Sequence, residues 1–513
     1  MQTLSSPAQA ALWLRQHVTG TLCADSRRLQ PGDAFIAWPG AALDARRFVG
    51  AALAQGAAAC LVEQAGLDAF GLDNPRVACY AGLKAATSAI AAEFFGHPSR
   101  QLAVLAVTGT NGKTSTAWWL AQALSALPQA RPCGMIGTLG VGRPAPLEGA
   151  VAAEDLVPTG LTTPDPVRLQ QTLRQFVDQG LQACAIEASS IGIEEHRLDG
   201  TVLRVALLTN LTQDHLDYHG SMEAYWQAKC KLFAWPGLPA AVVNIDDPYG
   251  AQLARTLEGQ GGLDLWSISS QRTARLQACN IGYSSQGLRF DVSEAGRPAQ
   301  TLHSRLIGGY NVSNLLGVLA GLRALDVPLD QALAVCSRLG PVPGRMECLG
   351  NADEPLVAVD YAHTPDALAQ ALSALQPLAR QRGGRLWCVF GCGGDRDASK
   401  RPLMGAIAAQ KADLVVVTSD NPRSEKPESI IAQILLGSAP GPHLYVHADR
   451  AEAIAFAVAQ AQASDVLLLA GKGHEQTQEI AGCKRPFSDR LHALQALRAR
   501  SPQSAQAHTG ALA

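Results

Sequence analysis

One short segment, Val104 to Ser115, constrains the fold of this chain more than any other. It joins an apolar run typical of a buried strand (102–107) to a helical pattern (115–127) through a loop that contains two glycines. Glycines let backbone N–H groups close around phosphate oxygens, and the positive end of the following helix strengthens that attraction. The segment therefore predicts an α/β unit with a phosphate-binding loop between its strand and its helix.

The loop also carries side chains suited to a nucleoside triphosphate. Lys113 is long enough to reach the β- and γ-phosphates, and the hydroxyl of Thr114 is a suitable ligand for Mg²⁺. The usual spacing places a further glycine where Val107 stands, which makes this loop a short variant. A glycine turn without a nucleotide is the alternative, but the strand–loop–helix context argues against it. We predict an ATP site formed by Gly109, Thr110, Asn111, Gly112, Lys113 and Thr114.

Length and charge narrow the possible functions. A chain of 513 residues exceeds what one hydrophobic core supports, and we expect roughly two to four domains. The 44 acidic and 42 basic residues nearly balance, which predicts neither a nucleic-acid partner nor a membrane-surface partner. We find no apolar run of the roughly 20 residues that a transmembrane helix needs, and no pattern of a secretory signal. Twelve cysteines without a C-x-x-C pair predict reduced thiols and a cytoplasmic location.

Three blocks of strand and helix patterns follow one another along the chain. Residues 1–100 carry short patterns that predict a small N-terminal α/β domain. Residues 101–340 alternate strands with helices, which is typical of a mostly parallel sheet. A stretch rich in proline and glycine then interrupts the pattern, and a second α/β series occupies residues 341–500. We predict a disordered tail over residues 501–513.

Acidic and imidazole side chains follow two later strands of the middle block. Glu187 ends one predicted strand, and His215 lies in the loop after another. Phosphoryl-transfer enzymes hold Mg²⁺ with strand-end acids beside a phosphate loop, and we favour Mg²⁺ here. His215 and His219, four residues apart, could instead share a zinc ion, although no cysteine or third histidine lies at ligand spacing. An acid at the end of a surface strand is the alternative for Glu187.

Several of these motifs together resemble the Mur ligase family. They are Thr108–Thr114, Glu187–Ser190, Asn210–His219 and Gly309–Asn314, with further matches from Asp25 to Glu475. That family builds the peptidoglycan stem peptide by ATP-driven amide synthesis. The resemblance implies three domains: an N-terminal UDP-sugar-binding domain, a central P-loop ATPase domain and a C-terminal Rossmann-like domain that binds the amino acid.

The resemblance also implies a set of catalytic residues and two Mg²⁺ ions. The catalytic residues are Lys113, Glu187, His215 and Lys229, and the metal ligands are Thr114, Glu187, His215 and Lys229. Lys229 matches a family lysine that CO₂ converts to a carbamate (N6-carboxylysine), which replaces a repelling ammonium with an anionic oxygen ligand. Without the resemblance, Lys229 would be an ordinary solvated helix residue. Asn314, Arg345 and Asp360 match positions that contact ATP, the latter two across a domain interface.

Electrostatics explain why such chemistry needs these groups. A carboxylate is a poor electrophile, and transfer of the ATP γ-phosphoryl group converts it to an acyl phosphate that an amine can attack. The carboxylate must approach an anionic triphosphate, and each pair of unit charges 4 Å apart repels by about 4 kcal/mol at an effective dielectric constant of 20. Cations therefore have to lie between the anions. Lys113 and the predicted metal site meet that need.

Other motifs bear on the substrates. The resemblance implies contacts with UDP-MurNAc-L-Ala-D-Glu from Ser26, Thr162, Thr163, Ser189, Glu195 and Arg197. Glu195 stands where the family pattern has glutamine. Asp420–Arg423 resembles the signature of the family branch that adds meso-diaminopimelate, although Asp-Asn-Pro is also a common turn. The implied diaminopimelate contacts are Arg396, Asp420, Asn421, Pro422, Arg423, Gly471 and Glu475.

Charge gives the diaminopimelate hypothesis a physical basis. Arg423 can clamp a carboxylate with two charge-assisted hydrogen bonds, while Asp420 and Asn421 can meet an ammonium. We therefore expect a cytoplasmic, monomeric ligase that adds meso-diaminopimelate to a D-glutamate γ-carboxylate through an acyl phosphate. The enzyme alternatives are a lysine-adding relative and a ligase like folylpolyglutamate synthase. A nucleotide-dependent switch without ligase chemistry is the alternative from another class, and it would leave Glu187, His215 and Lys229 without roles.

Overall fold

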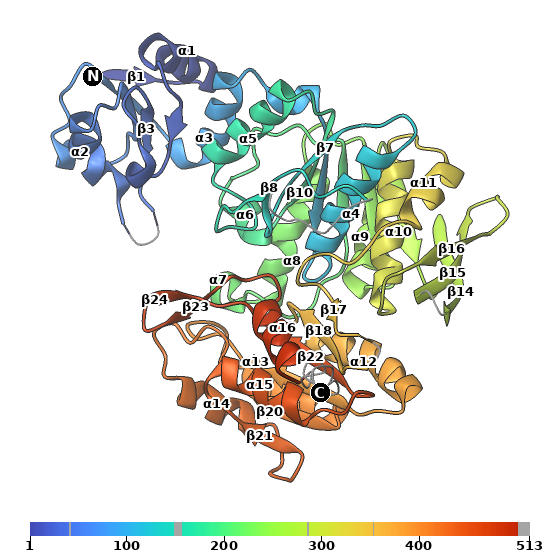
Figure 1. Cartoon of the computed structure of the whole chain (residues 1–513). Helices are drawn as coiled ribbons and strands as arrows, with labels where there is room; N and C mark the ends of the chain where they lie inside the picture. Colours follow the sequence, from blue (N-terminus) through green and yellow to red (C-terminus); the bar gives the residue numbers. More distant parts are fainter. Residues whose placement is uncertain (41–42, 148–155, 285–286, 352, 501–513) are drawn as a thin grey trace, which may run out of the picture.

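The computed structural model describes residues 1–40, 43–147, 156–284, 287–351 and 353–500, and it builds them around three main sheets (Figure 1). We name the parts by their strands: the N-terminal region (β1–β5), the middle region (β6–β16) and the C-terminal region (β17–β24). The predicted α/β class with mostly parallel sheets is confirmed. The domain boundaries at residues 100 and 340 stay predictions, and the predicted tail (501–513) lies outside the described residues.

The N-terminal region is a parallel sheet with the strand order β1-β5-β4-β3-β2. Its strands are β1 (Gln2–Leu4), β2 (Leu22–Cys23), β3 (Ala34–Ala37), β4 (Ala59–Glu63) and β5 (Val77–Tyr80). Helices α1 (Pro7–His17) and α3 (Leu83–Phe94) pack on one face, and α2 (Val49–Ala54) packs on the other. Alternate strand residues enter the two cores because successive side chains point to opposite faces.

The middle region is an eleven-stranded sheet in the order β16-β15-β14-β13-β12-β11-β6-β10-β7-β8-β9. The strands are β6 (Ala103–Thr108), β7 (Cys133–Gly137), β8 (Gly140–Gly142), β9 (Leu156–Val157), β10 (Ala183–Glu187), β11 (Val205–Leu208), β12 (Ala240–Asn244), β13 (Asp264–Ser269), β14 (Leu276–Ser284), β15 (Gly287–Glu294) and β16 (Gln300–Ser304). The centre is parallel and the outer strands are antiparallel. Strand β6 lies between β10 and β11, which brings the carboxyl ends of all three together.

Helices cover both faces of the middle sheet, as a parallel sheet requires. One face packs against α4 (Lys113–Ala126), α10 (Tyr310–Arg323) and α11 (Leu329–Cys336). The other packs against α5 (Pro166–Asp178), α8 (Met222–Cys230) and α9 (Pro248–Gln260). Along β6, Leu105 and Val107 enter the first core while Val104 and Ala106 enter the second. The short helices α6 (Ser190–Glu194) and α7 (Leu216–His219) lie close to the carboxyl edge.

The C-terminal region lies below the middle region in Figure 1 and is a second, mostly parallel sheet in the order β17-β18-β22-β19-β20-β21. Its strands are β17 (Glu347–Leu349), β18 (Leu356–Asp360), β19 (Leu386–Phe390), β20 (Leu414–Val417), β21 (Leu444–Val446) and β22 (Val466–Ala470), with a hairpin of β23 (Thr477–Ile480) and β24 (Cys483–Pro486). Helices α12 (Pro365–Arg382), α13 (Lys400–Lys411) and α14 (Pro427–Leu435) cover one face, and α15 (Arg450–Gln460) and α16 (Asp489–Arg500) cover the other.

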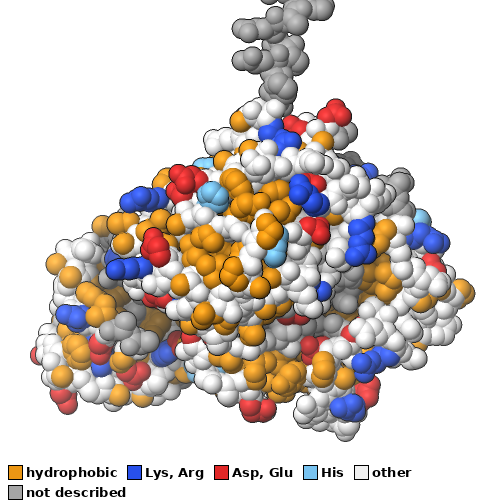
Figure 2. All heavy atoms as spheres, turned by 90° about the horizontal axis from the view of Figure 1, so that it is seen from below, with side chains coloured by type: hydrophobic (Ala, Val, Ile, Leu, Met, Phe, Trp, Pro, Cys, Tyr) orange, Lys and Arg blue, Asp and Glu red, His pale blue; other side chains and the backbone are white. Residues whose placement is uncertain are grey.

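The face of the molecule that Figure 2 shows agrees with the near balance of charge in the sequence. Seen from below, acidic and basic side chains are scattered among hydrophobic ones rather than gathered by sign (Figure 2). Within the described parts of the chain, we find no helix with both the length and the apolar character needed to span a membrane.

Candidate active site

The phosphate loop connects β6 to α4 at the carboxyl edge of the middle sheet. Gly109 has a φ of 140° and Gly112 a φ of 85°, values that side chains other than glycine rarely adopt. Asn210, which follows β11, fixes the loop by accepting from the backbone N–H of Asn111 at 2.9 Å and donating to its carbonyl at 3.1 Å. The neighbouring strand thus holds the loop in shape.

Lys113 begins α4 and lies folded against this loop. Its Nζ donates to the carbonyl oxygens of Gly109 at 2.9 Å and of Thr110 at 2.8 Å. Burial lowers the pKa of Lys113, and the negative charges of Glu187 and Asp214 oppose that shift. The predicted lysine is therefore placed within the loop, with carboxylates of two different strand ends near it.

The carboxylate of Glu187 is fully buried and accepts three hydrogen bonds. Its Oε2 accepts from the hydroxyls of Thr114 at 2.9 Å and Thr138 at 3.1 Å, and its Oε1 accepts from the Thr138 backbone N–H at 2.7 Å. Arg345, from the C-terminal region, donates to the Thr114 hydroxyl at 3.0 Å. The structure thus brings Thr114, Glu187 and Arg345 together, while their predicted roles toward metal and ATP stay predictions. Thr138 was missed because β7 ends in no charged motif.

Lys229 and His215 also lie near Lys113. Lys229 is 1% exposed, donates to the Gly109 carbonyl at 2.8 Å and lies 4.5 Å from the centre of the Tyr225 ring. Burial, with the nearby charge of Lys113, holds the pKa of Lys229 well below its ordinary value. Burial also lowers the pKa of His215 to about 4. Both side chains are therefore biased toward their neutral forms.

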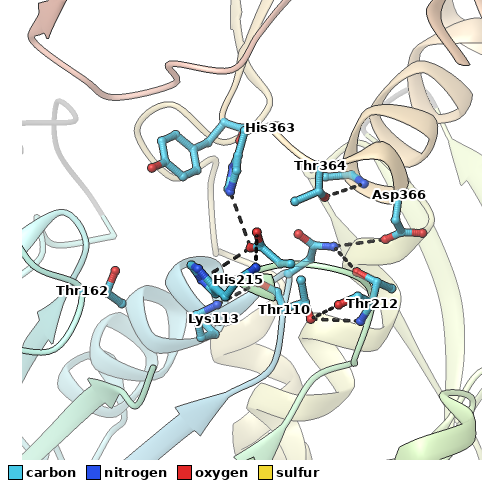
Figure 3. A network of polar contacts seen from close by, with 12 residues as sticks. Thr110, Lys113, Thr162, Thr212, His215, His363, Thr364 and Asp366 are labelled. Carbon is cyan, nitrogen blue, oxygen red and sulfur yellow. Dashed lines mark hydrogen bonds and ion pairs between the residues drawn. The ribbon is translucent and has the colours of Figure 1, made fainter. Parts of the chain in front are cut away.

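Asp214 and His363 form a contact across the regions that the sequence did not predict. Oδ2 of Asp214 lies 3.5 Å from Nε2 of His215 and 3.8 Å from Nε2 of His363. Burial acts to raise the pKa of Asp214, but the hydrogen bond and charge of His363 outweigh it and hold that pKa well below its usual value. His363, just before α12, points toward this carboxylate (Figure 3).

The donors present suit Mg²⁺ better than zinc. Thr114 and Glu187 supply hard oxygen atoms side by side, which is the ligand type that Mg²⁺ prefers. His219 instead bonds to the Ser190 hydroxyl at 2.9 Å. Among the residues that the structure describes, no three His, Cys, Asp or Glu side chains gather closely enough to hold a metal.

A cavity of about 710 Å³ opens between the middle and C-terminal regions. The predicted ATP residues that line it are Thr110, Asn111, Gly112, Lys113, Thr114, Asn314, Arg345 and Asp360, and the other predicted residues in its wall are Thr162, Glu187, Ser189 and His215. A Cβ added to Gly112 would collide with the Asn314 side chain, which explains the glycine. The guanidinium of Arg345 lies 4.2 Å from the centre of the Tyr361 ring. Asp360 accepts from two backbone N–H groups, and burial raises its pKa.

Four of the six residues predicted for the nucleotide substrate form one network beside Glu187. Thr162 lies 3.1 Å from the Thr138 hydroxyl. Thr163 donates to the Glu187 carbonyl at 2.7 Å and lies 3.1 Å from the hydroxyl of Ser189, the N-cap of α6. Arg197 donates to the Thr163 carbonyl at 2.8 Å.

The other two residues lie apart from that network. Glu195 pairs with Lys84 of the N-terminal region at 2.7 Å and accepts from the Tyr218 hydroxyl at 2.6 Å. Glu195 thus joins two regions in this structure. Ser26 lies in a short turn of the N-terminal region after Asp25, and it is not part of the cavity wall described above.

The residues predicted for diaminopimelate gather at the carboxyl edge of the C-terminal sheet, outside the wall of that cavity. Asn421 donates to Glu475 Oε2 at 2.8 Å. A Cβ added to Gly393 would lie 3.0 Å from Nη1 of Arg423 and 3.8 Å from Cγ of Arg396, so both arginine side chains pass close to Gly393. The remaining members of the predicted set are Asp420, Pro422 and Gly471, the last with a φ of 115° and its Cα beside the Asp420 carboxylate.

The predicted contact of Asn421 with a substrate ammonium stays a prediction. In the structure the side-chain oxygen of Asn421 accepts from Nζ of Lys472 at 3.0 Å and from the Glu479 backbone N–H at 3.0 Å. Both acceptor positions of that oxygen are therefore used by the protein itself. Asn421 can offer an N–H instead, because Nδ2 has a second hydrogen besides the one given to Glu475.

His474, two residues after Lys472, connects this edge to the middle region. Its ring is hydrogen-bonded to the backbone of Thr138, lies 5.4 Å from the Tyr361 ring and has a buried Nδ1 without a partner in the described chain. Burial and the charge of Arg345 lower its pKa to about 3. The Gly471–Glu475 motif was the available signal, but only Gly471 and Glu475 were singled out from it.

Comparison with known proteins gives consistent matches over nearly the whole chain. Residues 107–322 match the Mur ligase middle domain, and residues 344–473 match the family described as Mur ligase, glutamate ligase domain. The UDP-N-acetylmuramoyl-L-alanyl-D-glutamate–2,6-diaminopimelate ligase of Acidovorax sp. (strain JS42) is 62% identical over 98% of this chain and 99% of its own length.

Solved structures agree with that result. One of a UDP-N-acetylmuramoyl-L-alanyl-D-glutamate–2,6-diaminopimelate ligase has a TM-score of 0.62 at 35% identity, with 93% of this chain and 94% of that chain covered. The MurF ligase of Thermotoga maritima in complex with ADP has a TM-score of 0.64 at 18% identity, with 94% and 97% covered, and is similar in fold.

Proposed function

The chain belongs to the Mur ligase family, and we propose that it joins meso-diaminopimelate to the D-glutamate γ-carboxylate of UDP-MurNAc-L-Ala-D-Glu. The γ-phosphoryl group of ATP passes to the carboxylate, and ADP leaves. The amine of diaminopimelate then attacks the acyl phosphate, loses a proton and displaces inorganic phosphate. The product is an amide in the stem peptide of a peptidoglycan precursor.

One observation carries this proposal: the hydroxyl of Thr114 contacts side chains from both regions that form the cavity. Thr114 donates to Glu187 of the middle region and accepts from Arg345 of the C-terminal region. A nucleotide switch needs only the loop. A ligase needs anionic and cationic groups from two regions at the point where a carboxylate meets a triphosphate.

The charges around the cavity fit that chemistry. Lys113 and Arg345 are cations placed to offset repulsion between the substrate carboxylate and the phosphates. Mg²⁺ is the metal that we assign, with Thr114 and Glu187 as oxygen ligands, and His215 and Lys229 as further ligands that the family resemblance adds. When bound, the metal supplies additional positive charge at the phosphates.

The burial of Lys229 supports its assignment as a carbamate. Its Nζ is enclosed, bonded to the Gly109 carbonyl and close to the positive charge of Lys113. Burial and the positive charge of Lys113 favour the neutral amine, which is the form that adds to CO₂, and the hydrogen bond to Gly109 fixes the position of Nζ. The addition forms an N–C bond, releases one proton and leaves an anionic carbamate.

The predicted domain boundaries and the remaining substrate contacts complete the proposal. Residues 1–100 bind the UDP-sugar end, with Ser26 as a contact; residues 101–340 bind ATP; and residues 341–500 bind the amino acid. Thr162, Thr163, Ser189, Glu195 and Arg197 contact the muramoyl dipeptide. We propose that the protein acts in the cytoplasm as a monomer.

The residues predicted for diaminopimelate lie at the carboxyl edge of the C-terminal sheet, which we call the amino-acid edge. Its charges favour meso-diaminopimelate over lysine. Two arginines, Arg396 and Arg423, lie near Gly393, and two carboxylates, Asp420 and Glu475, belong to the same edge of the sheet. The far end of diaminopimelate carries one carboxylate and one ammonium. The arginines would bind the carboxylate, and Asp420 and Glu475 would bind the ammonium. Lysine carries only the ammonium and would leave the arginines without an anionic partner.

Product identification tests the function directly. We would incubate the protein with UDP-MurNAc-L-Ala-D-Glu, ATP, Mg²⁺ and meso-diaminopimelate, and omit each component in turn. We expect a product heavier by one diaminopimelate residue, formed together with ADP and only in the complete mixture. ADP release without any amine would instead support the nucleotide switch, and extension of a folate substrate with glutamate would support the folylpolyglutamate alternative.

A further inference from the structure

Lys472 is a buried cation for which the function proposed above has no use. It lies between β22 and β23, is 0% exposed and uses all three of its ammonium hydrogens. Nζ donates to Asn421 Oδ1 at 3.0 Å, to Glu475 Oε2 at 2.7 Å and to the Thr477 carbonyl at 2.8 Å. A buried lysine is costly unless it is paired, and these acceptors satisfy it completely.

The glycines on either side of Lys472 allow its side chain to turn inward at this point. Gly471 has a φ of 115° and Gly473 a φ of 53°. A Cβ added to Gly473 would lie 2.6 Å from the Gly344 carbonyl oxygen and 2.8 Å from Cβ of Tyr361. The Gly-Lys-Gly pattern therefore places one ammonium beneath the amino-acid edge.

Lys472 is one of three groups that fix which end of the Asn421 amide faces outward. The oxygen of that amide accepts from two donors, Lys472 and the Glu479 backbone N–H, while Nδ2 donates to the Glu475 carboxylate. A flipped amide would put its NH₂ group against both donors and its oxygen against the carboxylate. Every contact would then be repulsive, and a single orientation remains while Lys472 is present.

We propose that Lys472 is a positioning residue for the amino-acid substrate, and this inference rests on the function proposed above. It holds Asn421 with an N–H directed to a substrate carboxylate, and it fixes one oxygen of Glu475 while leaving the other for a substrate ammonium. In the described chain, Oε1 of Glu475 and the second Nδ2 hydrogen of Asn421 have no partner. The ligand class is an amino acid whose far end carries both a carboxylate and an ammonium.

The position of the arginines supports this division of the edge. A Cβ added to Gly393 would lie 3.0 Å from Nη1 of Arg423 and 4.0 Å from the backbone carbonyl oxygen of Asn421. Arg423 donates to the Gly394 carbonyl at 2.6 Å, which holds it there. The guanidinium of Arg423 thus lies close to the backbone of Asn421, while the Glu475 carboxylate is bonded to its side chain.

The variant Lys472→Met tests the proposal, with Lys484→Met on the exposed strand β24 as the matched control. We expect Lys472→Met to raise the KM for meso-diaminopimelate about tenfold or more, because the charge-assisted hydrogen bonds that hold both the Asn421 amide and the Glu475 carboxylate are lost. The KM for ATP should stay unchanged, and the preference in kcat/KM for diaminopimelate over L-lysine should narrow. A purely structural role would reduce the amount of folded enzyme and leave both KM values at the wild-type level.

A second variant, Asn421→Asp, decides the matter if Lys472→Met does not fold, as judged by thermal unfolding. It keeps an oxygen for Lys472 but turns a second oxygen toward Glu475 and the substrate carboxylate. We expect the KM for diaminopimelate to rise about tenfold or more, again without a change for ATP. A diaminopimelate KM within about twofold of wild type in the folded variant would overturn the inference. A wild-type protein without diaminopimelate-dependent turnover would overturn the proposed function instead.

Discussion

The phosphate-loop site and the amino-acid edge lie at the carboxyl edges of two parallel sheets, but different parts of the chain organise them. At the phosphate loop the backbone has the larger role, because Gly109 and Gly112 shape the loop and its carbonyls hold the lysines. At the amino-acid edge the side chains have the larger role, because Asn421, Lys472 and Glu475 bond to one another.

This difference suggests how rate and choice of substrate are separated. A loop made of backbone N–H groups suits any polyphosphate of the correct shape, and it acts on the reaction that all amino acids share. A network of fixed donors and acceptors distinguishes one amino acid from another, because a wrong partner leaves buried polar groups unpaired. Changes at the first site should alter turnover, and changes at the second should alter selection.

The largest effect is expected for Lys113→Ala. Removing this cation from the phosphate loop should lower kcat about 1000-fold, because charge on the transferring phosphoryl group is no longer offset. The KM for diaminopimelate should change little. Steady-state ADP release measures both quantities, and a kcat within about tenfold of wild type would remove Lys113 from the transfer step.

Lys229→Ala should lower kcat about 100-fold and should respond to small anions. Formate or acetate added at high concentration should restore part of the activity by supplying the missing carboxylate. Lys231→Ala is the matched control, because Lys231 is an exposed neighbour paired with Glu194 at 2.8 Å. Normal turnover of Lys229→Ala would contradict the carbamate assignment.

Arg423→Ala addresses the other side of the comparison. We expect the KM for diaminopimelate to rise about 30-fold while the KM for ATP is unchanged, because a charge-assisted clamp on a carboxylate is lost. Arg485→Ala, on the exposed strand β24, serves as the control. Equal changes in both KM values would show that Arg423 supports the fold rather than the substrate.

The smallest effect concerns the link between the two sites at His474. Its pKa is lowered to about 3 in the folded protein, mainly by burial, and is about 6.5 when unfolded. Above pH 6.5 the neutral ring contributes its full stability, which is lost as the pH falls toward 3, by about 1.4 kcal/mol at pH 5.5. Thermal unfolding should therefore show a weaker pH dependence for His474→Gln than for wild type between pH 7 and about pH 5.5. Parallel curves would contradict this role.

The sequence predicted much of the fold because its strands are buried on both faces and are apolar throughout. The predicted strand at residues 102–107 and the predicted helix at 115–127 agree with β6 (Ala103–Thr108) and α4 (Lys113–Ala126) to within two residues at each end. The contact between Thr114 and Glu187 was also predictable. Strand β6 leads into the loop before Thr114, strand β10 ends in Glu187, and the two strands end at the same edge of one sheet.

The remaining parts of the site depend on segments far apart in the chain. Thr138 lies at the end of β7, where no motif marked it, and the Asp214–His363 contact joins two regions. The sequence selected Asn421, but only its neighbours Lys472 and Glu479 show which end of its amide faces outward. Sequence spacing identifies candidate residues, and three-dimensional packing determines which of their hydrogen-bonding atoms face the substrate.

The most direct test of the account is the ratio of kcat/KM for meso-diaminopimelate to that for L-lysine, measured as ADP release by the wild-type protein with UDP-MurNAc-L-Ala-D-Glu. An edge with two arginines beside two carboxylates predicts a preference for diaminopimelate of about 100-fold or more. Equal values for the two amino acids would contradict the claim that side-chain polarity at this edge selects the substrate.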